Sequence, residues 1–292
     1  MKIPFFFWAL LSFQMLAAQD ADYNAWMRSD GTLEGFVVGN QHFTYVSDAN
    51  LRDKPSTQSN VVTTLPIGTK VEILERNDAT YSLSGVTLPW VKVRVLMAGK
   101  NRQEGYLWGG FLALASIQTP IEEYTPNAGV QYLTGVSAYD EAKHEITVQV
   151  RIALNGKELS KCTFKTGGDL SYYPEFEVSF EPLNKVKAVL MVNYYYPACG
   201  YASGDNLLFW QQNNQLTKVL ETSSISEAGQ FYSTETYLLP SQRGGIGDHI
   251  LVSKDMSEFI EKGDDYERSK QNIALILYKW TGDKLLKVKE LK

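Results

Sequence analysis

The chain has 292 residues, of which 44% are hydrophobic and 21% are charged. This is the composition of an ordinary globular protein, and the length favours two domains over one. The formal net charge of -5 argues against the basic surface that a nucleic-acid partner requires.

Residues 1–18 have the pattern of a signal peptide. Lys2 supplies the positive start, residues 3–16 are apolar, and two alanines form a small-residue exit at 17–18. The apolar run contains Pro4 and is shorter than the roughly 20 residues that cross a membrane, so cleavage is expected and no membrane span after it. No cysteine lies near the exit. We therefore expect an exported protein, periplasmic or extracellular, that is not a lipoprotein.

Alternation of apolar and charged residues runs through residues 41–115. Apolar residues take every second position at Val71 and Ile73, and again at Val91, Val93 and Val95. Such alternation predicts half-buried strands. Leu65-Pro66-Ile67-Gly68 fits a type I turn, and a long loop with Tyr81, Gly85 and Pro89 is expected before Trp90. Short strands with frequent turns predict a small antiparallel barrel.

The same stretch carries a set of motifs in a fixed order. They are Asn50-Leu51-Arg52, Pro55-Ser56, Leu65-Pro66-x-Gly68, Val71-x-Ile73, Trp90-x-Lys92-Val93 and Gly105-Tyr106-Leu107. In this order they resemble the bacterial SH3-like domain, which implies a small barrel that binds a component of the cell envelope. The chain departs from the family pattern at Asp53-Lys54, where a turn glycine is common, and at Tyr106, where tryptophan is common.

Five residues of this domain are candidates for binding a ligand: Trp108, Trp90, Tyr106, Asn50 and Arg52. Alternation places Trp108 away from the barrel interior, beside two glycines, where its ring would stack on a sugar or peptide. The alternative for Trp108 is packing against the next domain, and for Trp90 a place in the core or hinge. Asn50 and Arg52 flank buried Leu51; the alternatives for them are a turn cap and a solvated charge.

Two prolines and a glutamate pair make residues 118–127 the expected linker to a second domain at 120–292. The sequence of this domain predicts strands. Apolar and polar residues alternate at 144–152 and at 175–180. Residues 185–196 are more continuously apolar, as in a strand covered on both faces. Hairpins are expected around Asn213-Asn214 and Gly282-Asp283. The predicted fold is mainly β, an SH3-like barrel followed by an antiparallel β-sandwich, with one helix near 256–270. A partial propeller-like sheet is the alternative.

The two cysteines allow three interpretations. Export to an oxidising compartment favours a disulfide between Cys162 and Cys199. The alternatives are two buried thiols, or a nucleophilic Cys199 with His249 as its base. Cys199 lies between proline-alanine and glycine, with no amphipathic helix after it, so the third interpretation lacks the helix start that activates a thiolate.

The second domain shows no motif that identifies a chemistry. The glycine-rich loop at 243–247 lacks the lysine of a phosphate-binding loop, and the three histidines are scattered, so we expect no metal and no cofactor. A pair of catalytic carboxylates remains an alternative, because the sequence does not show how far apart two carboxylates lie in space. An aromatic cluster around Tyr194, Tyr195, Tyr196, Tyr201 and Trp210 suits a sugar-binding face or, alternatively, a core with its rim.

Together these observations favour a non-catalytic exported protein of the cell envelope, whose SH3-like domain binds cell-wall peptide or glycan such as peptidoglycan. Two alternatives remain: a peptidoglycan hydrolase that uses Cys199 or a carboxylate pair, and an envelope scaffold or inhibitor that acts through protein contacts.

Overall fold

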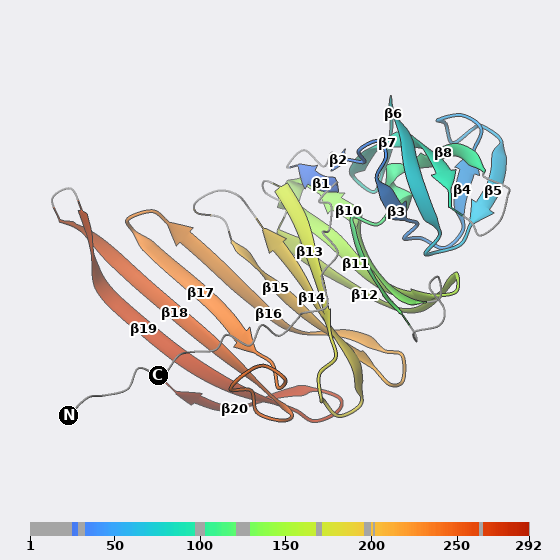
Figure 1. The fold of residues 1–292 in the computed structure, drawn as a ribbon. Helices are drawn as coiled ribbons and strands as arrows, with labels where there is room; N and C mark the ends of the chain where they lie inside the picture. The colour runs from blue at the N-terminus through green and yellow to red at the C-terminus, as the bar shows by residue number, and fades with distance from the viewer. Residues whose placement is uncertain are drawn as a thin grey trace, which may run out of the picture.

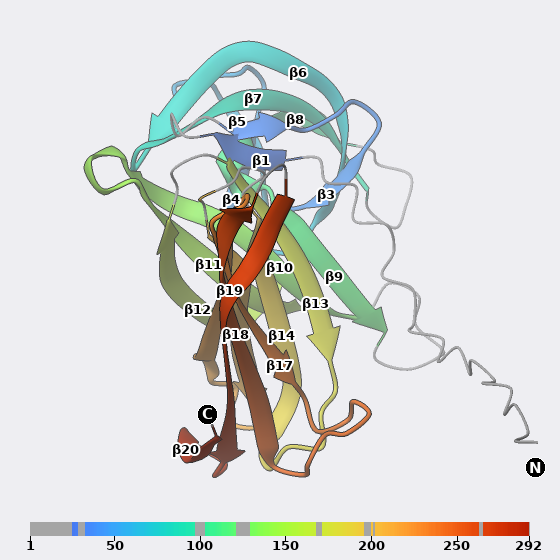
Figure 2. The ribbon, with the colours of Figure 1, turned by 90° about the vertical axis from the view of Figure 1, so that its left-hand side faces the viewer.

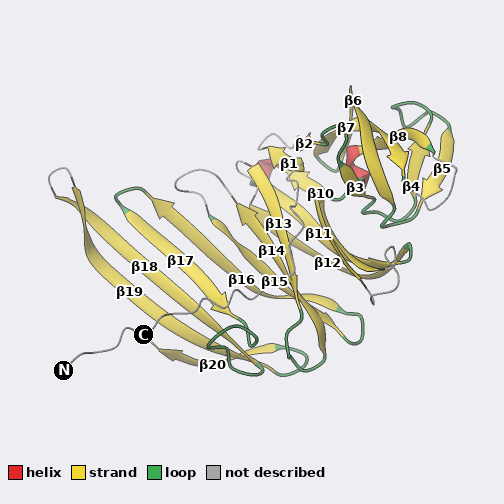
Figure 3. Cartoon of the chain, in the orientation of Figure 1, coloured by secondary structure: helices red, strands yellow, loops and turns green. Residues whose placement is uncertain are grey.

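The computed structural model describes residues 25–28, 33–96, 103–120, 129–167, 171–195, 200, 202–262 and 265–291. Within these residues the chain is built from antiparallel strands and two short 3-10 helices, with no α-helix (Figure 3). None of the described helices is long and apolar enough to cross a membrane. The mainly β fold predicted from the sequence is confirmed, and the signal peptide lies outside the described residues.

The first sheet has six strands in the order β3-β6-β7-β8-β4-β5 (Figure 1). Its elements are β3 (Gln41–Phe43), β4 (Ala49–Arg52), β5 (Val61–Leu65), β6 (Lys70–Leu83), β7 (Val86–Val95), β8 (Glu104–Trp108) and the 3-10 helix η1 (Gly109–Phe111). Just beyond the ends of β3 and β5, the Thr44 N–H donates to Thr69 O at 2.9 Å, and the Gly68 N–H donates to Thr44 O at 2.8 Å. These bonds continue the pairing of β3 with β6 into the turn that follows β5.

The turn between β5 and β6 differs by one residue from the expected one. The Thr69 N–H donates to Pro66 O at 3.3 Å, so the turn spans 66–69, with Gly68 third at a φ of +76°. A positive φ at this position is the geometry of a type II turn, which selects glycine. A β-carbon on Gly68 would also lie 1.8 Å from Oε1 of Gln131.

The long loop expected before Trp90 is instead a β-hairpin. Tyr81 lies in β6, Pro89 lies in β7, and Ser84 and Gly85 form the turn with φ values of +53° and +80°. The alternation of this segment is interrupted by a register shift between Arg76 and Thr80, which hides the hairpin from a period-two search.

Two further sheets form the rest of the chain. The four-stranded sheet, in the order β12-β11-β10-β9, contains β9 (Ala115–Pro120), β10 (Gly129–Asp140), β11 (Glu145–Leu154) and β12 (Lys157–Gly167), with the 3-10 helix η2 (Glu141–Lys143) between β10 and β11. The ten-stranded sheet runs in the order β2-β1-β13-β14-β15-β16-β17-β18-β19-β20. Its strands are β1 (Ala25–Arg28), β2 (Leu33–Gly35), β13 (Ser171–Ser179), β14 (Val186–Tyr195), β15 (Ser203–Gln211), β16 (Leu216–Glu227), β17 (Phe231–Leu238), β18 (His249–Lys262), β19 (Asp265–Trp280) and β20 (Leu285–Leu291).

The four-stranded sheet packs on one part of the ten-stranded sheet, as in a sandwich (Figure 1). Ile146, Val148, Val150 and Ile152 of β11 are fully buried in one cluster with Leu190 of β14. The other face of β14 contributes Val189 to a second cluster, which contains Trp280. β14 is therefore covered on both faces, as its continuous apolar run predicted.

Both predicted hairpins are present. Asn214 turns β15 into β16 at a φ of +65°, and Gly282 turns β19 into β20 at a φ of +97°. The prediction of a helix near 256–270 is wrong, because residues 256–262 belong to β18 and residues 265–270 belong to β19. The two strands pair from His249↔Lys279 to Lys262↔Asp265, and their cross-strand partners satisfy the backbone that a helix would satisfy internally.

The first three residues of the expected linker form part of a strand of the second domain. Residues 118–120 belong to β9, which pairs with β10 from Thr134↔Ala115 to Gly129↔Pro120, and residues 121–128 lie outside the described part. At the other end of the chain, β1 and β2 form the edge of the ten-stranded sheet through Met27↔Tyr172. This pairing spans more than a hundred residues, which local pattern does not reveal.

The barrel sits directly on the four-stranded sheet (Figure 2). The Leu114 N–H donates to Thr134 O at 2.8 Å, the Tyr139 N–H donates to Ser84 O at 2.9 Å, and Gln131 Nε2 donates to Gly68 O at 2.9 Å. Buried residues of both parts also share one hydrophobic cluster. The barrel and the sandwich are thus joined by a packed interface.

Candidate ligand-binding face

The two tryptophans proposed to contact a ligand are covered. Trp108 is 5% exposed and Trp90 is 3% exposed. The Trp108 ring lies edge-on between Tyr81 and Phe111, at centroid distances of 5.4 Å, and its Nε1 donates to Tyr81 O at 2.9 Å. The prediction of a stacking platform at Trp108 and Trp90 is therefore wrong, because the β6–β7 hairpin folds over this end of the barrel.

The other candidates lie on an open part of the same outer surface. Arg52 of β4 and Lys92 of β7 are both cross-strand partners of Tyr106 in β8. Directly paired residues project from the same face of a sheet, so Tyr106 lies between Arg52 and Lys92 on this face. All three side chains are half-buried, and the Tyr106 ring packs partly on the barrel core. We call Arg52, Tyr106 and Lys92 the Tyr106 face.

The charges beside this face are unequally neutralised. Arg94 of β7 makes ion pairs with Glu72 at 3.1 Å and Glu104 at 3.0 Å, and its hydrogen bond to Glu104 is the main cause that raises the Arg94 pKa. Lys92 makes no ion pair within the described part of the chain, although Glu75 is its cross-strand partner in β6. The Tyr106 face therefore presents positive charge to a ligand.

Arg52 and Asn50 also have structural contacts. Arg52 Nη1 donates to Ser59 O at 2.5 Å, and Thr64 Oγ1 donates to Asn50 Oδ1 at 3.1 Å. Asp53, at a point of departure from the family pattern, accepts hydrogen bonds from the Asn60 N–H at 3.1 Å and from its Nδ2 at 3.0 Å. These bonds hold the loop after β4 in place next to the Tyr106 face.

The sequence did not indicate Lys92 as a candidate for ligand binding. Alternation placed Lys92 on the same face as Trp90, but only the cross-strand pair Lys92↔Tyr106 shows that it lies beside Tyr106. The pairing depends on a contact between β7 and β8, whose connecting residues 97–102 lie outside the described part.

The aromatic cluster of the second domain is not an open sugar-binding face at the positions described. Tyr194 and Trp210 are both 6% exposed, and the Tyr132 and Trp210 rings meet edge-on at 6.1 Å. Burial is the main cause that raises the pKa of Tyr194 to about 12. Tyr196 and Tyr201 lie outside the described residues, as does the side chain of Tyr195. Tyr194 and Trp210 belong to the core.

One of the two cysteines lies in the described part of the chain. Cys162 of β12 is half-buried near Lys218 of β16, and burial is the main cause that raises the pKa of its thiol. Cys199 lies outside the described residues, so the disulfide and the Cys199 nucleophile both stay predictions.

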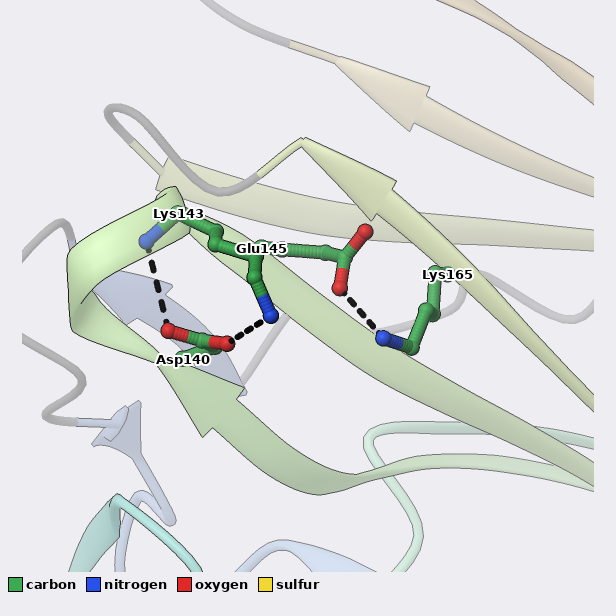
Figure 4. Close-up of polar contacts among 4 residues, drawn as sticks. All are labelled: Asp140, Lys143, Glu145 and Lys165. Carbon is green, nitrogen blue, oxygen red and sulfur yellow. Dashed lines mark hydrogen bonds and ion pairs between the residues drawn. The ribbon is translucent and has the colours of Figure 1, made fainter.

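The described residues include no group of three or more histidine, cysteine or acidic side chains arranged to hold a metal ion. A cluster of charges at the β10–β11 connection is satisfied internally (Figure 4). Asp140 accepts from the Lys143 N–H at 3.2 Å and from its Nζ at 2.9 Å, and Lys165 Nζ donates to Glu145 at 2.6 Å. The cluster caps η2 and ties two strands together, which is a structural role.

Comparison with known proteins recognises one part of the chain. Residues 47–113 match the family described as Bacterial SH3 domain. No curated protein and no solved structure matches the chain. The match covers β4 to η1, which contains the whole Tyr106 face, and it suggests a module that binds the cell wall. The chain therefore carries a bacterial SH3 domain at residues 47–113, followed by antiparallel sheets in which no family is recognised.

Proposed function

We propose that the protein is an exported, non-catalytic component of the cell envelope whose bacterial SH3 domain binds cell-wall peptide or glycan at the Tyr106 face. The observation that carries this proposal is the register that places Arg52 and Lys92 on either side of Tyr106. The family match and the signal-peptide pattern at residues 1–18 support the cellular location.

The chemistry of this face suits a peptide that carries carboxylates. A tyrosine ring offers a large contact area with few rotamers to immobilise, and its hydroxyl both donates and accepts hydrogen bonds. Arginine binds carboxylates through paired N–H donors, while the lysine ammonium adds a mobile charge. Cell-wall stem peptides carry free carboxylates, so they fit this arrangement.

The test is sedimentation of the mature protein with purified peptidoglycan at physiological salt. We expect the wild-type protein to sediment, Tyr106→Ala to lose most of this binding, and Lys92→Ala to weaken it and reduce its dependence on salt. The matched control is Tyr266→Ala, which removes a tyrosine that is 59% exposed on β19. A wild-type protein that stays in the supernatant would overturn the proposal, as would equal binding by Tyr106→Ala.

The two alternatives give different results. A hydrolase would release dye from labelled peptidoglycan, and loss of this release in Cys199→Ala would implicate the thiol. A scaffold or inhibitor would show no affinity for peptidoglycan but would form a stable complex with another envelope protein on crosslinking.

A further inference from the structure

One face of the last three strands carries several exposed apolar side chains. Its residues are fixed by cross-strand pairs, because paired side chains project from the same side of a sheet. These pairs are Leu251↔Leu277, Ser253↔Leu275, Leu275↔Leu291, Leu277↔Lys289 and Lys279↔Leu286, and Asp255↔Ile273 continues the row. Lys289 is therefore the one charge in the apolar part of this face, and it lies on β20, the edge strand of the sheet. We call this surface the β18–β20 face.

The apolar side chains of the β18–β20 face remain open to solvent. Ile273 is 52% exposed, Leu275 37%, Leu286 43% and Leu291 51%. The opposite face of the same strands is different, because there Ile250, Val252, Ile276 and Trp280 are buried in a core cluster. An antiparallel sheet that is packed on one face normally carries polar residues on the other. A group of exposed apolar side chains on the open face marks an interaction surface.

Charges of opposite sign lie at the two ends of this face. Asp255 pairs with Ile273 at one end, and Lys279 lies six residues along β19 at the other, or about 20 Å away. Neither side chain makes an ion pair with another described residue. Asp255 accepts hydrogen bonds only from neutral groups, Tyr232 at 3.1 Å and Gln271 at 3.1 Å.

The outer edge of β20 discourages strand addition. β20 ends the sheet order and carries Lys287 and Lys289, with a register shift opposite Leu277 and Tyr278. If two copies of β20 paired antiparallel about their midpoint, these lysines would face one another. Lysines and bulges on an edge strand oppose such pairing. The face of the sheet, rather than its edge, is therefore the surface that suits a second copy.

We propose that a second copy of this chain covers the β18–β20 face, with the two sheets packed face to face about a two-fold axis and their strands antiparallel. This arrangement brings Lys279 of each copy to Asp255 of the other, so both charge pairs form at once. A two-fold interface uses the same patch on both copies and closes on itself, which gives a dimer and no larger assembly. The Tyr106 face is on another domain and stays free.

The first test is the mass of the mature full-length protein by sedimentation velocity and light scattering, from low to high micromolar concentration. We expect a dimer that dissociates on dilution. The double variant Leu275→Glu with Leu291→Glu should be a monomer with an unchanged circular dichroism spectrum, because both side chains are partly exposed. Ile273→Glu is a second variant with the same expected result. Phe180→Glu, at a residue 64% exposed outside this face, should leave the dimer intact.

The second test addresses the orientation of the two copies. Lys279→Asp and Asp255→Lys should each raise the dissociation constant at least several-fold, and the double variant should recover most of the loss. A wild-type monomer at every concentration would overturn the proposal and leave the face to a different partner protein. A dimer that survives Leu275→Glu with Leu291→Glu would overturn it as well, and absence of recovery in the charge swap would overturn the antiparallel arrangement.

Discussion

Arg151 of β11 lies over the ring of Tyr45, with its guanidinium carbon 5.0 Å from the ring centroid. Tyr45 lies on the barrel side, just after β3, whereas Arg151 belongs to the four-stranded sheet. The Tyr45 ring packs in one cluster with Ala113 of the barrel side and Leu133 of β10. A β-carbon on Gly135 would lie 2.9 Å from this ring, so glycine is required there. One aromatic ring thus joins the two halves of the protein.

Tyr45→Ala is expected to destabilise the protein by about 3–5 kcal/mol, because it removes a buried ring and leaves a cavity between the halves. Tyr45→Phe keeps the ring and loses only the hydroxyl contact with Arg151, which is worth about 1 kcal/mol. The measurement is urea unfolding of both variants. Equal losses for the two substitutions would show that the ring does not stabilise the interface.

Trp108→Ala is expected to lower the free energy of unfolding by about 3–5 kcal/mol, since the indole fills the space between Tyr81 and Phe111. It should leave peptidoglycan binding per folded molecule unchanged, because the ring is covered and does not belong to the Tyr106 face. Thermal unfolding and sedimentation with peptidoglycan measure the two effects. Lost binding in a folded Trp108→Phe variant would show that this side chain contacts the ligand after all.

Glu181 joins two distant loops of the ten-stranded sheet. Its carboxylate accepts from Ser179 Oγ at 2.6 Å, from Ser241 Oγ at 2.8 Å and from the Ser241 N–H at 2.9 Å. Glu181→Ala leaves the Ser241 N–H without an acceptor and should cost about 1–3 kcal/mol. Glu181→Gln retains an oxygen acceptor and should cost less. Urea unfolding of the two variants measures this difference in stability as a difference between their midpoints, provided that the denaturant dependence of the unfolding free energy is the same. Identical midpoints for Glu181→Ala and Glu181→Gln would contradict the prediction.

Asp140 should show a titration that depends on Lys143. The hydrogen bond from Lys143 is the main cause that holds the pKa of Asp140 below its ordinary value. A lowered pKa in the folded state adds stability that is present above the unfolded pKa and is lost as the pH falls through the folded pKa. Carboxyl NMR titration should give a low midpoint for Asp140 that rises in Lys143→Ala. Lys165→Ala, whose partner is Glu145, is the control and should leave it unchanged.

Local pattern was a good guide wherever a strand has one buried face. Val91, Val93 and Val95 alternate in the sequence and are fully buried, and Ile146 to Ile152 do the same in β11. The two hairpins were also correct, because Asn214 and Gly282 tolerate the positive φ that their turns need. In these segments the strand or turn that neighbouring residues favour is the one found in the complete fold.

The errors have a common cause, which is contact between residues far apart in the chain. The sequence placed Trp108 on an outer face, but Tyr81, 27 residues earlier, covers that face and accepts its indole N–H. Residues 256–270 carry charges at spacings that a helix tolerates, but β18 and β19 pair along their whole length. A local window contains neither the covering hairpin nor the partner strand.

The sequence by itself determined the strands with one buried face, the turns at Asn214 and Gly282 and the presence of a bacterial SH3 domain, because alternation and turn chemistry act over a few residues. Only the tertiary structure decided which side chains remain accessible. It buried Trp90 and Trp108, and it brought Lys92 and Arg52 to Tyr106 through pairings between separate strands. The solvent accessibility of a side chain depends on the residues that cover it, and these residues can be far away in the sequence.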